Sequence, residues 1–99
     1  MAEKSPNQEL RLFGLRLRDI RLQFGMTLEQ MSALLDIGPT HLSNIERGRR
    51  DPSFALLAAI GVRLNVSLDY LVLGRPDERR AATFILRSDE ELLAEVVAK

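Results

Sequence analysis

Apolar residues recur at intervals of three and four along almost the whole chain, which is the spacing of one face of an α-helix. No run of residues alternates between apolar and polar over the length of a strand. The pattern therefore predicts an all-α protein. We expect a compact five-helix domain over residues 9–74, followed by a C-terminal extension over residues 75–99 with a further helix at residues 88–98.

The first helix is predicted over residues 10–24 and is expected to end at Gly25. Thr27 can cap the second helix through its hydroxyl, and Gln30, three residues later, completes a capping box. The core stripe of the first helix is predicted to contain Phe13, Leu17, Ile20 and Phe24.

A third helix is predicted directly after a tight turn at residues 36–38. Pro39 suits its first turn because the missing N–H group would have no partner there, and Gly48 ends it. Polar side chains crowd the outer side of this helix. The side chains expected to face inward are Pro39, Leu42, Ile45 and Glu46, and those expected to face outward are Thr40, His41, Asn44 and Arg47.

Two further helices are predicted before the extension, one capped by Ser53 and a short one capped by Ser67 that stops at Gly74. The inner stripe of the fourth helix is predicted to be Phe54, Leu57, Ile60 and Leu64. Other apolar residues lie off the predicted core stripes and require a cover. They are Ala55, Ala59 and Val62 in the fourth helix, and Leu12, Leu15 and Leu22 in the first.

The extension is charged at first, apolar at residues 81–86 and helical from Ser88. Its carboxylates, Asp89, Glu90, Glu91 and Glu95, are expected to form a solvated helix start that complements the helix dipole. A helix of about ten residues is marginal alone in water, so this one must pack on something. Either it contributes to a homodimer or it folds back on its own domain, through Phe84, Leu86, Leu92, Leu93, Val96 and Val97.

Charge is balanced overall but unevenly placed, with 14 basic and 14 acidic residues in 99. Residues 11–50 hold seven arginines against four acidic residues, whereas residues 88–99 are mainly acidic. Cysteine is absent, which excludes disulfides and makes a reducing cytoplasm the natural compartment. No apolar run approaches the roughly 20 residues of a membrane helix, so we expect no membrane association. We also expect no cofactor.

Two short helices joined by a tight turn, the second with polar side chains outward, are typical of a helix-turn-helix unit that binds double-stranded DNA. Asn44 can pair with adenine, Thr40 can bond a base or contact the thymine methyl group, and His41 can approach guanine. Free N–H groups at helix N-termini and nearby cationic side chains favour the binding of DNA phosphates. The candidates for DNA backbone contacts are Thr27, Gly38, Pro39, Ser43, Arg47, Arg49 and Arg50.

Catalysis is disfavoured by the same residues. His41 is the only histidine, it has no carboxylate three or four residues further on, and Ser43 lies on a different helical face. Neither a catalytic triad nor a metal pair is therefore indicated. We expect a protein that is not an enzyme.

Residues 13–73 resemble the Cro and phage-repressor type of helix-turn-helix family, also called XRE-like or lambda-repressor-like. The matching segments are LRDIRLQFGMT, LEQMSALLD, IGPTHLSNIERG, RRDPS and NVSLDYL. The chain departs from the family pattern at Asp36, where glycine is usual, at Ser32, where alanine is usual, and at Leu28, where many members have glutamine.

The resemblance implies a role for individual residues. Arg21 matches an arginine that pairs with the glutamate of the third helix, here Glu46, and its place on the core stripe calls for such a partner. The base-reading positions match Thr40, His41 and Asn44, and the backbone positions match Arg47 and Arg49.

The implied function is sequence-specific transcriptional regulation. The protein is expected to act as a repressor that inserts helix 39–47 into the major groove of an operator, as a homodimer. The alternative is an antitoxin-like or other protein-interaction module, which uses the same scaffold to bind a partner protein through the C-terminal extension.

Overall fold

The computed structural model describes residues 6–75 and 88–97, and all of its regular elements are helical, as the sequence predicts. The elements are α1 (Pro6–Gln23), α2 (Leu28–Leu35), α3 (Pro39–Glu46), α4 (Phe54–Ala59), the π-helical turn η1 (Ile60–Leu64), α5 (Leu68–Leu73) and α6 (Asp89–Val97). None of the described helices is both long and apolar enough to cross a membrane.

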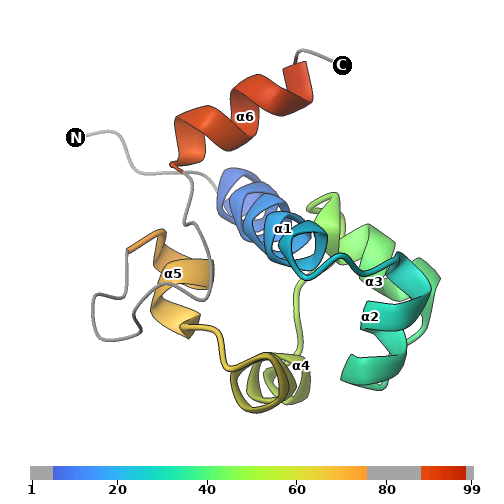
Figure 1. Ribbon diagram of the computed structural model, residues 1–99. Helices are drawn as coiled ribbons and strands as arrows, with labels where there is room; N and C mark the ends of the chain where they lie inside the picture. The colour runs from blue at the N-terminus through green and yellow to red at the C-terminus, as the bar shows by residue number, and fades with distance from the viewer. Residues whose placement is uncertain (1–5, 76–87, 98–99) are drawn as a thin grey trace.

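The long helix α1 lies in the middle of the molecule and organises the rest (Figure 1). Helix α3 packs on one side of it and α2 packs on α3, while α5 packs on another side and α6 crosses above. The turn η1, which continues α4, contacts α2. Because α1 contacts α3, α5 and α6, it connects the N-terminal half of the fold to both later parts of the chain.

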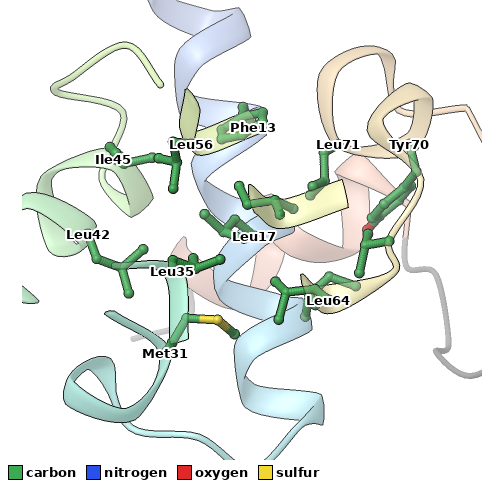
Figure 2. Close-up of a cluster of buried hydrophobic side chains, with 13 residues drawn as sticks. Phe13, Leu17, Met31, Leu35, Leu42, Ile45, Leu56, Leu64, Tyr70 and Leu71 are labelled. Carbon is green, nitrogen blue, oxygen red and sulfur yellow. The ribbon is translucent and has the colours of Figure 1, made fainter. Parts of the chain in front are cut away.

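The core forms where α1 meets α3, η1 and α5, and Figure 2 shows side chains from all these elements converging around Leu17. Leu17 and Ile20 of α1 and Leu42 and Ile45 of α3 are almost completely buried. Full burial of one such side chain stabilises a fold by roughly 1.5–3 kcal/mol. The core therefore fixes the position of α3 against α1.

Helix ends follow the predicted capping chemistry. The Thr27 hydroxyl accepts a hydrogen bond from the Gln30 N–H, and the Gln30 side chain accepts one from the Thr27 N–H, which completes the capping box. The hydroxyls of Ser53 and Ser67 cap α4 and α5 by accepting one hydrogen bond each, from the N–H groups of Leu56 and Tyr70. Gly74 ends α5 in a left-handed conformation, which glycine adopts without strain.

The first helix differs from its prediction at both ends. It begins at Pro6, a residue whose fixed φ suits the first position of a helix, and it ends at Gln23. Phe24 therefore lies outside α1 and is 38% exposed, so its predicted place in the core stripe is wrong. Gly25, the next residue, has φ of +70° and turns the chain out of the helical path.

The predicted inner stripe of the fourth helix is correct for Ile60 and Leu64, which are buried, and for Leu57, which is partly buried against the core, but it is wrong for Phe54. Phe54 is 86% exposed, whereas Leu56 is buried and forms the stripe with Ile60 and Leu64. Spacings of four residues align well here because η1 has wider turns than an α-helix. Ala59, expected on the outer side, is half-buried and packs against the core.

The C-terminal helix α6 packs on α1 of its own chain. Leu12 and Leu15, the residues predicted to require a cover, are buried together with Leu92 of α6, whereas Leu22 stays exposed. α6 thus packs within its own chain, and a contribution of this segment to a homodimer stays a prediction. Phe84, Leu86 and the Val97 side chain lie outside the described residues.

Candidate nucleic-acid interface

The turn between α2 and α3 is closed by local hydrogen bonds. The N–H of Ile37 donates to the carbonyl of Ser32 at 3.0 Å, and Asp36 adopts the left-handed conformation with φ of 60°. The buried Ser32 hydroxyl donates to the carbonyl of Glu29 at 2.9 Å, so its polarity is satisfied within α2. Two of the three departures from the family pattern, Asp36 and Ser32, are thus accommodated, and the turn holds α2 and α3 in a fixed relation.

One side of α3 is embedded in the core and the other is open. Leu42 and Ile45 are buried, while Thr40 is exposed and His41 and Asn44 are half-exposed. The side chains of these three polar residues form no hydrogen bond or ion pair with any residue of the described ranges. They are therefore available to an external partner, in one row along an eight-residue helix.

Pro39 does not face inward as predicted but is exposed. It occupies the first position of α3, and the buried residues of this helix begin one turn later, at Leu42. Its contribution is a fixed φ at the helix start. Gly38 precedes it as the N-cap and offers no side-chain hydrogen bond, so the first-turn amides of Thr40 and His41 are left open at this terminus.

A buried ion pair anchors the far end of α3. The Arg21 guanidinium donates from Nε to Glu46 Oε2 at 2.8 Å and from Nη2 to Glu46 Oε1 at 3.0 Å. Its Nη1 donates to the carbonyl of Met26 at 2.9 Å. Both side chains are buried, so each charge depends on the other for compensation. The pair joins α1, the α1–α2 connection and α3.

Two glycines bring α1 unusually close to the end of α3. A Cβ atom added to Gly14 would lie 2.4 Å from the carbonyl oxygens of Ile45 and Glu46, and one added to Gly48 would lie 2.7 Å from the Cα of Arg11. No larger residue fits at Gly14 without a shift of backbone. The only sequence signal for this contact was a glycine in the middle of a predicted helix.

The remaining candidates for phosphate contacts are distributed around α2 and α3. Arg47 follows the last turn of α3, and Arg49 and Arg50 lie in the connection to α4, all three exposed. Thr27 is exposed at the N-terminus of α2, and Ser43 is half-buried on α3. The arrangement offers cations at one end of α3 and open amides at the other.

Arg16 is a buried residue that the sequence did not single out. The residue is 1% exposed, and its guanidinium donates from Nη2 to both carboxylate oxygens of Asp89 at 2.8 Å and from Nη1 to the carbonyl of Leu71 at 3.0 Å. Asp89 is thus engaged in an ion pair, not in the purely solvated helix start that was expected. The available signal was the spacing of Leu12, Arg16 and Ile20, which places an arginine on a buried face.

The described residues do not indicate a metal-binding site. Among residues 6–75 and 88–97, no group of three or more histidine, aspartate and glutamate residues could hold a metal ion.

Comparison with known proteins identifies a matching family. The model of the family described as Helix-turn-helix matches residues 17–71, which is more than half of the chain. These residues include α2, α3 and the Arg21–Glu46 pair.

Individual relatives match over much the same region. The chain is 41% identical over 59 residues to the HTH-type transcriptional regulator ImmR of Bacillus subtilis, covering 60% of this chain and 46% of the relative. It is 39% identical over 57 residues to the transcriptional regulator ClgR of Mycobacterium tuberculosis, covering 58% and 51%. It is 32% identical over 74 residues to the control protein C.BamHI of Bacillus amyloliquefaciens, covering 70% and 91%.

The chain thus spans about half the length of the first two of these regulators. No solved structure matches it significantly.

Proposed function

The chain belongs to the helix-turn-helix family, and we propose that it is a sequence-specific transcriptional regulator that inserts α3 into the major groove of an operator. The observation that carries the proposal is the open row of Thr40, His41 and Asn44 on a helix whose opposite side is locked in the core. An α-helix fits the major groove, where each base pair presents a distinct pattern of donors and acceptors. The names of the relatives, as transcriptional regulators, support the same role.

Each polar side chain in the row has a chemistry that suits a base edge. Asn44 can donate to N7 and accept from N6 of adenine in a bidentate pair, and Thr40 can offer its hydroxyl or its methyl group. His41 can donate to the acceptors of guanine. The absence of partners for these side chains among the described residues supports this assignment.

Contacts with DNA backbone phosphates would fix the position of α3 in the groove, so that its side chains reach the base edges. The open amides of Thr40 and His41 after Gly38 and Pro39, the Thr27 end of α2 and the Ser43 hydroxyl can donate to phosphate oxygens. The exposed Arg47, Arg49 and Arg50 supply charge. These contacts give affinity that depends on salt but little sequence preference.

We further propose that the protein binds as a homodimer and represses by occupying its operator. Two strongly exposed apolar side chains lie in α4 and η1, Phe54 at 86% and Val62 at 82%, and a subunit contact would cover them. A two-fold dimer places two copies of α3 about one turn of DNA apart, roughly 34 Å. Two sets of phosphate contacts then compensate for the weak binding of one small domain.

The test is selection of a random double-stranded DNA pool on the purified protein, followed by sequencing. We expect an enriched palindrome whose half-sites are about ten base pairs apart. Asn44→Ala should lose the preference at one position of each half-site, by about 1–3 kcal/mol of discrimination, because the bidentate pair is gone.

Arg47→Ala is the matched comparison for Asn44→Ala. It should weaken binding to all sequences alike and reduce the salt dependence, because a phosphate contact carries no base information. If no sequence is enriched in the pool and binding disappears as salt rises, sequence-specific recognition is contradicted. A single unpaired half-site would contradict the dimer alone.

A further inference from the structure

A surface pocket lies where α1, the end of α3 and α6 meet, and of the residues that line it only Arg47 is among the proposed DNA contacts. Its volume is about 380 Å³. This is in the range of small-molecule sites in proteins. The residues that line it are Arg11, Leu15, Arg18, Glu46, Arg47 and Val96.

Three of the lining residues are arginines, and the backbone holds them around the same hollow. Arg11 and Arg18 are seven residues apart on α1 and share one face of the helix. Arg47 comes from the end of α3, and the neighbouring Gly48 allows the chain to pass so close to Arg11 that a Cβ would meet its Cα at 2.7 Å. The convergence is therefore built into the packing of α1 against α3.

The positive charge of the pocket has no internal compensation. Within the described ranges the guanidinium groups of Arg11, Arg18 and Arg47 form no ion pair or hydrogen bond. The one carboxylate in the lining, Glu46, is already neutralised by Arg21 at 2.8 Å. Three like charges around one space repel one another, and a bound anion removes that repulsion.

We propose that this pocket binds a small organic anion that carries a phosphate group and a short apolar part. Arginine donates paired hydrogen bonds that match phosphate oxygens. The side chains of Leu15, buried, and Val96, half-buried, supply apolar wall on the remaining sides. Inorganic phosphate fits the charge of the pocket but leaves this apolar wall without a contact.

Occupancy of the pocket has a consequence for α3. Arg47 also belongs to the proposed DNA backbone contacts, so the anion and DNA compete for one guanidinium. This consequence rests on the proposed function, whereas binding of the anion does not. The experiment therefore uses the protein without DNA.

The test is titration of the full chain with phenyl phosphate, followed by NMR of the backbone amides. We expect saturable shifts at Leu15, Arg47 and Val96, and weaker binding of inorganic phosphate. Arg11→Gln and Arg18→Gln should each weaken phenyl phosphate binding by about tenfold or more, since each removes a charge-assisted contact. Arg11 is exposed, so its variant keeps the fold and remains informative if Arg18→Gln does not fold.

Arg75→Gln is the matched control, because it removes an exposed arginine outside the pocket. It should leave the affinity unchanged. An equal loss in this control would overturn the proposal, since binding would then follow net charge. Shifts confined to residues around Arg49 and Arg50, or no saturable shifts, would overturn it as well.

Discussion

Two arginines on α1, Arg21 and Arg16, perform the same chemistry for different parts of the molecule. Each donates to both oxygens of one carboxylate and also to a backbone carbonyl. Arg21 holds Glu46, whose side chain is 5% exposed, and thereby fixes α3. Arg16 holds Asp89, whose side chain is 31% exposed, and thereby fixes α6.

The difference lies in how far each carboxylate is removed from water. Glu46 has lost nearly all contact with solvent, so the charge of Arg21 is essential to it. Asp89 can still be solvated in part if Arg16 is lost, but Arg16 itself is buried and depends on Asp89. From the burial of the two carboxylates we expect the α3 side of the domain to be held more strongly than the α6 side.

The largest effect is expected at the Arg21 pair. Arg21→Ala leaves Glu46 buried without a counter-charge, and we expect a loss of about 3–5 kcal/mol in the free energy of unfolding. Urea denaturation measures it. The double variant Arg21→Met with Glu46→Leu should recover most of the loss, because neither charge remains. An unchanged midpoint for Arg21→Ala would remove the basis for ranking the two pairs.

The second-largest effect on stability is expected where Gly14 of α1 lies against the end of α3. Gly14→Ala places a methyl group against the carbonyls of Ile45 and Glu46, and overpacking of this kind costs about 1–3 kcal/mol. Thermal melting measures it. Gly61→Ala is the control, since its added Cβ meets only Leu68 side-chain atoms at 3.7 Å or more. Equal melting temperatures for the two variants would contradict the tight contact.

The smallest effect on stability is expected at the Arg16 pair. Asp89→Asn keeps the shape but removes the charge, and we expect a loss of about 1–2 kcal/mol because Arg16 retains the carbonyl of Leu71. Hydrogen exchange should show lower protection in α6 and no change in α3. Ser88 and Glu91 cap α6 independently, so Glu90→Gln serves as a charge-matched control on the same turn. Loss of protection in α3 would show that the two sides are not separate.

Local chemistry explains why the helix pair could be predicted from the sequence. The capping box of Thr27 and Gln30, the proline at the start of α3 and the glycine after α5 act through neighbours three or four residues away. The stripe of Phe13, Leu17 and Ile20 has the period of an α-helix, and all three are buried. Each of these signals is contained in one short segment, so it can be recognised without knowledge of the rest of the fold.

The sequence predictions were wrong where a distant segment or the end of a helix determines whether a residue is buried and which partner it has. Phe24 follows the end of α1 and Phe54 begins α4, so neither residue has helix on both sides to hold it on the stripe. The partner of Arg16 lies 73 residues away in the chain, and no local pattern identifies it. The base and phosphate contacts of Thr40, His41 and Asn44 remain predictions, because a side chain without an internal partner does not itself name its ligand.

The sequence separations of the two ion pairs also imply an order of folding. Arg21 and Glu46 close a segment of 25 residues, whereas Arg16 and Asp89 close one of 73. Closing the longer segment costs about 1 kcal/mol more in chain entropy. We therefore expect α2 and α3 to assemble on α1 first and α6 to dock last. The surface that meets DNA in our proposal would be complete while Leu12 and Leu15 still await their cover.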